Sequence, residues 1–300
     1  MCCLTTSQLY RVAHGNDAVL FRVYGAKTEV IIDRELENKI AAYLTQRGFG
    51  ARVFGGVRNG RVEEWLSGSS LKPNDMLRGD LMPKIGAKLA EMHALDMPVS
   101  RNPSVWLTME KWLEVALTLS FDEPERQAAY KALDLPTIKR EIMALKAKLM
   151  LVDSPVVFSH NDLLSGNIMY DADTDKVTLI DYEYSAYNYR GFDIGNHFCE
   201  CCGFDCDWSQ FPDKQKQFTF LRGYLSHALK VPQDQVPESA LNDLYYEVGP
   251  WALAPHLFWG IWAVVQARFS PIDFDFLNYA KLRLGGFFQM KADALKMVRK

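Results

Sequence analysis

Three side chains in the middle of the sequence, Asp162, Asn167 and Asp181, are spaced so that their oxygens could do chemistry together. Asp162 and Asn167 are five positions apart in "FSHNDLLSGNIMYD", and Asp181 ends the next apolar run, "KVTLID". A carboxylate can accept the proton of a reacting hydroxyl, and carboxylate and amide oxygens suit Mg²⁺. Phosphoryl transfer from ATP needs both functions in one cleft. The pattern therefore predicts Asp162 as the catalytic base and Asn167 and Asp181 as magnesium ligands.

The wider spacing supports this interpretation. His160, Asp162 and Asn167 have the H-x-D-x-x-x-x-N spacing of a kinase catalytic loop. The alternative is that Asp162 and Asn167 only cap a turn, as Asp and Asn commonly do. Asp181 at the end of a paired strand favours the catalytic interpretation, because it adds the second metal-binding acid.

The elements that must position these residues are short strands. "PVVFSH", "NIMYD" and "KVTLID" are apolar, and "DADTD" joins the last two as a turn. We expect the last two strands to pair, which places the acids at strand ends.

The N-terminal part predicts a small sheet with one helix. "VLFRVY" and "TEVIID" are typical of strands, whereas "DRELENKIAAYLTQRG" has helical spacing and ends near Gly48, a suitable C-terminal cap. "ARVFGGV" and "GRVEEWL" flank Asn59-Gly60, a pair that tolerates the positive φ angles of a tight hairpin turn.

Beyond the link "SGSSLKPND", long amphipathic segments indicate helices. They lie at 79–97, 104–120, 125–150 and 239–267. The sequence thus predicts an α+β fold with a β-rich N-terminal lobe, residues 1–68, and a mostly helical C-terminal lobe, residues 69–300.

Composition excludes some classes of protein. The 300 residues are 48% apolar and carry a formal net charge of −3, so we expect no nucleic-acid partner. The longest apolar run, "WALAPHLFWGIWAVV", is interrupted by Pro255 and His256, so we expect a buried helix and no membrane span. Six cysteines cluster at positions 2, 3, 199, 201, 202 and 206, which favours reduced thiols and a cytoplasmic protein over a disulfide framework.

These same stretches carry a resemblance to a known family. The chain resembles the eukaryotic choline/ethanolamine kinases, most densely in "HNDLLSGNIMYD" and "IDYEYSAYNYRGFDIGNHF", and also in "FWGIWAVVQ" and "IDFDFLNYA". The resemblance covers nearly the whole chain. It implies a protein-kinase-like two-lobed fold, with ATP between the lobes, Mg²⁺ as a cofactor and a small amino alcohol on the helical lobe.

The resemblance also assigns roles in the N-terminal lobe. Arg22 matches the cation that binds the ATP phosphates, and a guanidinium suits phosphate oxygens. The alternative for Arg22 is a surface charge on an edge strand. Glu37 falls where a helix glutamate of the family pairs with that cation, with Glu35 as a near rival.

Two further parts of the ATP site follow from the resemblance. Glu64 and Leu66 match the linker that offers backbone N–H and C=O groups to adenine. The family's Gly-containing phosphate loop has no counterpart in "MCCLTTSQLYRV", where Thr5 and Thr6 lie near the expected place. Either these hydroxyls cover the phosphates, or the natural chain extends further.

The resemblance places an ammonium pocket in the C-terminal lobe, next to the hydroxyl-activating Asp162. Aromatic faces attract cations, and a carboxylate adds charge pairing. Trp259 and Trp262 share one helix face, a spacing that is also common in core packing. The residues that match the pocket are Tyr184, Glu200, Trp259, Trp262, Phe274 and Tyr279.

The resemblance is closer to ethanolamine kinases than to choline kinases. "SPIDFDFLNYAKLR" and "FDCDWSQFP" carry this preference, and Asp205 stands where many choline kinases have Tyr, so it could meet a primary ammonium. The implied product is phosphoethanolamine for phospholipid synthesis.

Several alternatives stay open at this point. They are choline kinase as the main activity, an inactive kinase-like binding module, an aminoglycoside-type phosphotransferase and a protein kinase. No D-F-G or A-P-E string appears, which argues against a protein substrate. The sequence leaves a homodimer open.

Overall fold

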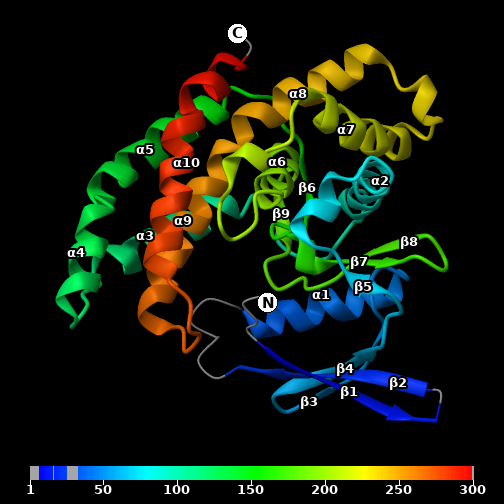
Figure 1. Ribbon diagram of the computed structural model, residues 1–300. Coiled ribbons are helices and arrows are strands. Elements are labelled where there is room, and N and C mark those ends of the chain that lie inside the picture. The colour runs from blue at the N-terminus through cyan, green and yellow to red at the C-terminus, as the bar shows by residue number, and fades with distance from the viewer. Residues whose placement is uncertain (1–6, 16, 26–32, 299–300) are drawn as a thin grey trace.

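The N-terminal lobe is built on one antiparallel sheet. The computed structural model describes residues 7–15, 17–25 and 33–298. The strands are β1 (Ser7–His14), β2 (Asp17–Tyr24), β3 (Val53–Val57) and β4 (Gly60–Glu64). Their order is β1-β2-β4-β3, so β2 and β4 are central (Figure 1). Most of the strand predicted at "TEVIID" lies outside the described residues.

The hairpin predicted around Asn59-Gly60 forms, but its turn geometry differs from the prediction. β3 pairs with β4 from Val57 opposite Gly60, and neither Asn59 nor Gly60 has a positive φ angle. A side chain at Gly60 would collide with the backbone carbonyl oxygen of Arg22 on β2. The glycine is therefore required by close strand packing rather than by a left-handed turn.

Helix α1 (Arg34–Gln46) lies between this sheet and the helical lobe, as Figure 1 shows. Asp33 caps it by accepting a hydrogen bond from the backbone N–H of Leu36 over 3.0 Å. Ile40 and Leu44 are buried at the predicted spacing, and Gly48 has a φ of 66° just beyond the end.

Small strands in the C-terminal lobe position the central polar residues. β5 (Ser69–Ser70), β7 (Ile168–Asp171) and β8 (Lys176–Leu179) form one sheet in the order β5-β7-β8. β7 and β8 pair in antiparallel register, as predicted from "NIMYD" and "KVTLID". β6 (Val156–Ser159) pairs with β9 (Ala186–Tyr189).

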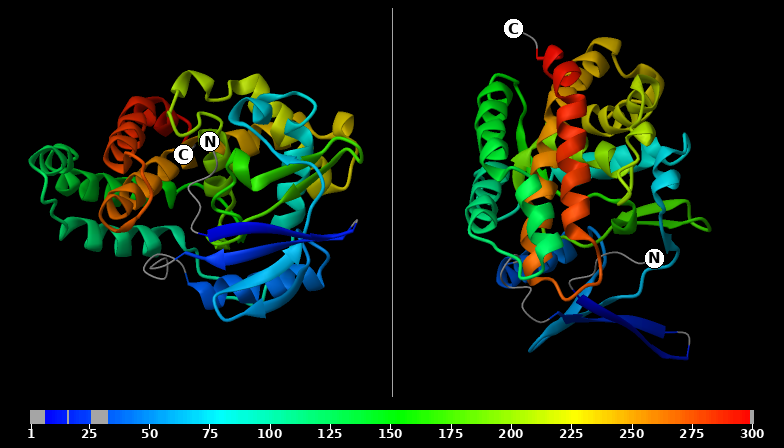
Figure 2. Two further views of the ribbon diagram at one scale, coloured as in Figure 1. Left: turned by 60° about the horizontal axis from the view of Figure 1, so that its bottom comes forward. Right: turned by 60° about the vertical axis from the view of Figure 1, so that its left-hand side comes forward.

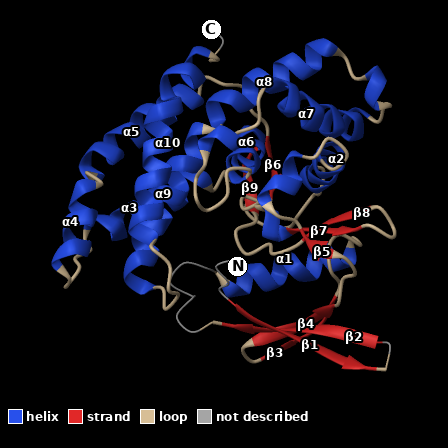
Figure 3. Ribbon diagram, viewed as in Figure 1, coloured by secondary structure: helices blue, strands red, loops and turns tan. Residues whose placement is uncertain are grey.

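Helices make up most of the C-terminal lobe (Figure 3). They are α2 (Met82–His93), α3 (Val105–Leu117), α4 (Pro124–Ala132), α5 (Leu135–Leu149), α6 (Arg190–Glu200), α7 (Lys214–Leu229), α8 (Glu238–Trp251), α9 (Leu253–Phe269) and α10 (Phe276–Lys296). The single helical segment predicted at 125–150 is divided into α4 and α5. Asp134 between them has a φ of 47° and caps α5, whose first turn contains Pro136.

Helix α9 is the centre of the helical core. It packs against α10, α3 and α6, and its residues from Leu253 to Ala267 are all buried. The views in Figure 2 show α9 and α10 side by side. Within the described residues, the stretch Glu238–Phe269 is long and apolar enough to span a membrane, but 94% of its most apolar window is buried in the protein. The buried helix predicted around Pro255 is thus confirmed.

Candidate active site

The loop after β6 brings Asp162 and Asn167 into contact. The side-chain amide of Asn167 donates to the backbone carbonyl of Asp162 over 2.8 Å and to its carboxylate over 3.1 Å. Asn161 turns the loop with a φ of 65°, in the left-handed region that Asn tolerates. Asn167 therefore fixes the loop and Asp162 together, while its amide oxygen remains the atom that could bind a cation.

Asp193 on α6 braces this loop. Its carboxylate accepts hydrogen bonds from the backbone N–H groups of His160 over 2.8 Å and Asn161 over 2.7 Å, and it lies 2.9 Å from Nε2 of His93. Burial alone would raise the pKa of Asp193, but the hydrogen bond from His93 and its charge outweigh burial and lower it. Asp193 thus holds the loop shape and is not positioned as a reacting group.

The end of β8 is tied to the same loop. The backbone N–H of Ile180 donates to the carbonyl of Asn167 over 3.0 Å, and Nε2 of His160 lies 3.0 Å from the carbonyl of Ile180. Asp181 follows with a φ of 65°. Asp162 and Asp181 consequently line the same pocket.

The carboxylates of this pocket perturb one another. Burial raises the pKa of Asp162 well above the ordinary value of an aspartate, and the nearby charges of Glu200 and Asp181 raise it further. Strongly shifted acids in a cleft are typical of functional sites. A cationic substrate or metal ion in this pocket would reverse that effect and favour the ionised form.

The residues predicted as metal ligands suit Mg²⁺. Oδ1 of Asp181 is buried without a hydrogen-bond partner, and Asn167 turns its N–H₂ group towards Asp162. The described residues contain no cluster of three His, Cys, Asp or Glu side chains that could enclose a metal. Two protein oxygens are nevertheless the usual share for Mg²⁺, which takes its other ligands from phosphates and water.

Arg22 lies on the central strand β2 and only 5% of it is exposed, so it is not a surface charge on an edge strand. Nε of Arg22 lies 3.2 Å from Glu63, and Nη1 lies 3.8 Å from Oδ2 of Asp181. Burial alone would lower the pKa of Arg22, but the charges of Asp181 and Glu63 outweigh it and raise the pKa. The structure thus places a permanent cation beside the predicted metal-binding acid.

The predicted pairing of Glu37 with Arg22 is wrong. Glu37 is buried, and its carboxylate accepts from Arg61 and from Arg34, each over 2.6 Å. Arg22 instead pairs with Glu63, which also pairs with Arg61. Arg61 lies directly opposite Arg22 on β4, and it is the guanidinium of Arg61 that reaches Glu37. Glu35 pairs with Lys39 in an exposed position and is not a rival.

The backbone of the predicted linker has fewer groups available to adenine than expected. The backbone N–H of Glu64 donates to the carbonyl of Arg52 over 2.7 Å, so it is not available to adenine. Leu66 follows β4 and is partly buried. Thr5 and Thr6 lie outside the described residues.

A pocket next to Asp162 is lined by most of the residues that were predicted to hold the ammonium ion. Trp259 and Trp262 both line it, with ring centroids 5.4 Å apart and nearly perpendicular planes. The indole of Trp262 donates to the hydroxyl of Tyr184 over 2.9 Å, which orients both rings. The lining residues are Asp162, Leu164, Asp181, Glu183, Tyr184, Glu200, Phe204, Trp259, Trp262 and Tyr279. Phe274 does not line the pocket but packs behind it, against Phe204 and Tyr279.

Glu200 is paired with a buried cation that sequence analysis missed. Nη1 of Arg283 on α10 donates to Glu200 over 2.8 Å and to the hydroxyl of Tyr279 over 3.2 Å. Arg283 is fully buried, and its Nε and Nη2 have no hydrogen-bond partner. Arg283 therefore positions the side chains of Glu200 and Tyr279. Its positive charge also offsets the negative charge of Glu200, which was expected to face the substrate ammonium without a cationic partner.

A different acid and a different aromatic residue line the pocket in place of Asp205. Asp205 is exposed and is not among the lining residues, so the expectation that it meets a primary ammonium is wrong. Its neighbour Phe204 faces inward instead. Glu183, two residues after Asp181, also lines the pocket, and sequence analysis missed it although it lies within the quoted "IDYEY".

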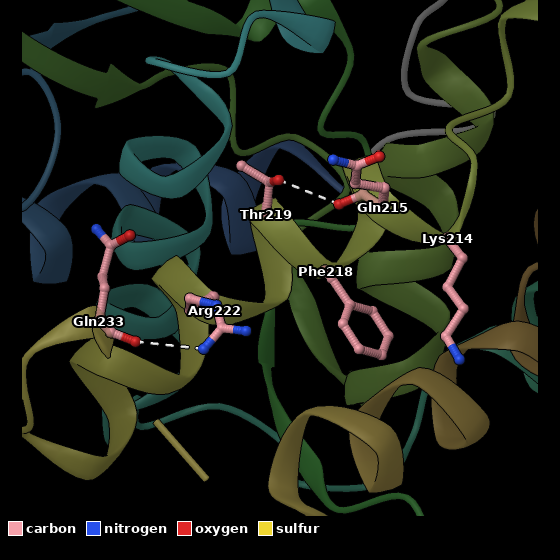
Figure 4. Close-up of a pocket in the computed structure, with 6 residues that line it drawn as sticks. All are labelled: Lys214, Gln215, Phe218, Thr219, Arg222 and Gln233. Atoms are coloured by element: carbon pink, nitrogen blue, oxygen red, sulfur yellow. Dashed lines mark hydrogen bonds between the residues drawn. The ribbon is translucent and has the colours of Figure 1, made fainter. Parts of the chain in front are cut away.

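A second hollow lies on the surface of α7, away from these residues (Figure 4). It is lined by Lys214, Gln215, Phe218, Thr219, Arg222 and Gln233. Lys214 lies over the rings of Phe218 and Tyr245, while Arg222 pairs with Glu238 over 2.6 Å. Its cations are already partnered and it has no acid in its lining, so it is no rival to the pocket beside Asp162.

Comparisons with known proteins bear on this arrangement. Residues 4–288 match the protein family described as Choline/ethanolamine kinase. The chain belongs to the choline/ethanolamine kinase family. This family member is 40% identical to a probable ethanolamine kinase of Arabidopsis thaliana over 281 residues, which are 94% of this chain and 74% of that protein. It is 38% identical to probable ethanolamine kinase A of Dictyostelium discoideum, over 93% of this chain and 79% of that protein.

A solved relative has the same architecture. The structure of an ethanolamine kinase from Plasmodium vivax superposes with a TM-score of 0.84 at 30% identity, covering 94% of this choline/ethanolamine kinase and 79% of that chain. The predicted family and the predicted protein-kinase-like two-lobed α+β fold are thus confirmed.

Proposed function

We propose that this protein transfers the γ-phosphoryl group of ATP to the hydroxyl of ethanolamine and so makes phosphoethanolamine for phospholipid synthesis. One observation carries the proposal: Asp162 lines a pocket whose walls are aromatic rings and carboxylates, the chemistry that holds a small ammonium ion. The relatives named ethanolamine kinase support the choice of substrate.

Asp162 is the catalytic base of the proposed reaction. It accepts the proton of the substrate hydroxyl as the oxygen bonds to the γ-phosphorus and the bond to ADP breaks. The hydrogen bond from Asn167 orients the carboxylate for this step. Arg22 would hold phosphate oxygens, since its guanidinium is buried beside Asp181 and stays charged.

Asn167 and Asp181 are the proposed ligands of Mg²⁺. When bound, the ion would neutralise charge on the phosphates during transfer. The orphaned Oδ1 of Asp181 is the observation that favours this role, because a buried carboxylate oxygen without a partner is costly unless a ligand satisfies it.

The remaining nucleotide contacts are assigned by element. Residues 1–68 would form the ATP-binding lobe and residues 69–300 the lobe that carries the base and the amino-alcohol pocket. Leu66 and the carbonyl of Glu64 would face adenine, and the hydroxyls of Thr5 and Thr6 would cover the phosphates. Glu37 would act through Arg61 and Glu63, which hold Arg22 in place.

The ammonium end of the substrate would meet Glu183, Tyr184 and the two tryptophans. A primary ammonium has three N–H donors and requires acceptors, whereas a trimethylammonium ion has none and requires aromatic walls. The pocket offers both kinds of group, so choline is the second candidate substrate. The cluster of acids, Asp162, Asp181, Glu183 and Glu200, favours ethanolamine.

An inactive binding module is disfavoured, because the proposed base Asp162, the proposed metal ligand Asp181 and the two tryptophans of α9 line one pocket. We also place the reaction in the cytoplasm, since the described cysteines, Cys199, Cys201, Cys202 and Cys206, are all free thiols.

The test is ADP release by the purified protein with Mg-ATP and a panel of ethanolamine, choline, their methylated intermediates and an aminoglycoside. We expect the highest kcat/KM with ethanolamine, and loss of turnover in a folded Asp162→Asn variant. A higher kcat/KM for choline would assign choline kinase as the main activity. No ADP release with any amino alcohol would refute the proposal.

A further inference from the structure

Glu63 on β4 pairs with two arginines of the N-terminal sheet. Arg22 on β2 lies directly opposite Arg61 on β4, so the two side chains leave the same face of the sheet, where like charges repel. Glu63 follows Arg61 by two residues and therefore lies on that face too. Its carboxylate is 3.2 Å from Nε of Arg22 and also accepts from Nε of Arg61. The sheet thus supplies its own counter-ion for Arg22.

Glu63 is ionised and fixed in place. The side chains of Arg22, Arg61 and Glu63 are each at most 8% exposed, so water and salt screen their charges weakly. Burial alone would raise the pKa of Glu63, but the charges of Arg22 and Arg61 outweigh burial and lower it. Arg61 also donates to Glu37 over 2.6 Å. Arg61 is therefore held by two carboxylates, and it in turn fixes Glu63.

The second acid beside Arg22 is held at a longer distance. Nη1 of Arg22 lies 3.8 Å from Oδ2 of Asp181, whereas a charged hydrogen bond between these groups would be about 2.8 Å long. Oδ1 of Asp181 has no hydrogen-bond partner among the described residues. Arg22, Glu63 and Asp181 line one small cavity between the lobes, which leaves the guanidinium room for a short shift. The pair with Glu63 therefore restrains Arg22 just short of a hydrogen bond with Asp181.

This separation matters for the proposed magnesium site. A carboxylate that is hydrogen-bonded to a guanidinium is a weaker metal ligand, because the metal must first displace the guanidinium. The same contact makes the guanidinium a weaker ligand for phosphate. Without the charge of Glu63, Asp181 would be the remaining ion-pair partner of Arg22 within the described part of the chain. The two groups would then approach each other, because opposite charges attract strongly where burial lowers the dielectric constant.

We propose that Glu63 is a positioning residue that holds Arg22 away from Asp181, so that Asp181 stays open to Mg²⁺ and Arg22 stays open to the phosphates of ATP. The inference rests on the proposed function, which supplies both ligands. Glu63 acts through Arg22 and takes the place that the sequence assigned to Glu37. Because Glu63 and Arg22 lie on neighbouring strands of one sheet, this arrangement needs no direct contact between Arg22 and α1.

The experiment is calorimetric titration of a non-hydrolysable ATP analogue at a series of Mg²⁺ concentrations. Glu63→Gln keeps the shape of the side chain and removes its charge. We expect the Mg²⁺ concentration for half-maximal binding to rise about tenfold, the effect of one charged hydrogen bond that competes for Asp181. Saturating Mg²⁺ displaces Arg22 from Asp181, so it should restore the affinity to within about twofold of the wild type. A purely structural role would weaken binding at every Mg²⁺ concentration.

Two double variants test whether the effect acts through Arg22. When Arg22→Met is already present, adding Glu63→Gln should leave the Mg²⁺ requirement unchanged, since no guanidinium remains to approach Asp181. Arg61→Gln together with Glu63→Gln removes one charge of each sign and should again raise the Mg²⁺ requirement about tenfold. This second pair answers the question if Glu63→Gln alone does not fold by circular dichroism.

The matched control is Glu35→Gln, which breaks an exposed pair with Lys39 on α1 and should keep the wild-type Mg²⁺ requirement. An unchanged requirement in folded variants that lack Glu63 but keep Arg22 would overturn the inference. So would a loss of affinity that saturating Mg²⁺ does not restore, a rise that persists without Arg22, or an equal rise in Glu35→Gln. Wild-type enzyme that gives the expected titrations but releases no ADP with ethanolamine would refute the proposed substrate and leave the inference standing.

Discussion

Replacing Arg283 with Met should destabilise the protein more than the loss of any surface ion pair. The pair between Arg283 and Glu200 is 2.8 Å long, and the two side chains are 0% and 6% exposed. Without the cation, the carboxylate of Glu200 stays buried and unpaired, which costs roughly 3–5 kcal/mol. At about 2 °C per kcal/mol for a chain of this size, we expect the melting temperature to fall by roughly 6–10 °C.

The matched control is Lys39→Met, which breaks a pair of similar length, 2.6 Å, whose side chains are 60% and 80% exposed. Water screens an exposed pair and its side chains stay mobile, so the melting temperature of this variant should fall far less than that of Arg283→Met. The double variant Glu200→Gln with Arg283→Met removes both charges and should recover at least half of the loss. Differential scanning fluorimetry measures all of these variants. Equal losses of melting temperature in Arg283→Met and Lys39→Met, or no recovery in the double variant, would refute the burial argument.

Four further outcomes follow from the site. Asp181→Asn should abolish turnover and weaken magnesium-dependent nucleotide binding, measured by steady-state ADP release and by titration with and without Mg²⁺. Arg22→Ala should raise the KM for ATP at least tenfold while the KM for ethanolamine changes little; equal KM values for ATP would remove its assigned role. Trp262→Ala should lower kcat/KM for choline by a larger factor than for ethanolamine, because a trimethylammonium ion depends more on aromatic walls. His197 is buried, which lowers its pKa from 6.5 to about 4, so the folded state takes up its proton less readily than the unfolded state. The stability from this group is complete above pH 6.5 and is lost as the pH falls towards 4, so wild type should lose about 2 kcal/mol more than His197→Asn between pH 7 and pH 5 in urea titrations.

Local pattern was enough to predict much of this molecule. The strands around Asp162 and the helix after Asp33 were predicted from the spacing of apolar residues and from turn-forming residues. Both signals depend only on residues a few positions apart. The lining role of Trp259 and Trp262 was predicted from the resemblance to the family, because their spacing on one helix face is also common in core packing. These features depend on the chain near each residue, so the sequence alone contains the relevant information.

The ion pairs could not be predicted in the same way. Glu200 and Arg283 are 83 positions apart, and Arg34 and Glu183 are 149 apart, so only the tertiary fold brings them together. The predicted partner of Glu37 was wrong because Arg22 and Arg61 lie opposite each other on neighbouring strands, and only the tertiary fold decides which of the two reaches α1. Asp205 was wrong for a related reason, since a shift of one residue in a loop exchanges an inward side chain, here Phe204, for an outward one.

Because they are buried, the cysteines Cys199, Cys201, Cys202 and Cys206 should react slowly with electrophiles. Burial raises the pKa of Cys199 and of Cys206 to about 12, and it raises those of Cys201 and Cys202 still further. Alkylating agents and peroxides attack the thiolate form of cysteine. These four thiols rarely ionise, and they are buried away from the solvent that carries the reagent. Slow labelling of these thiols by iodoacetamide would therefore report how often the region around α6 opens, and a bound substrate that holds Glu200 in place should slow that labelling further.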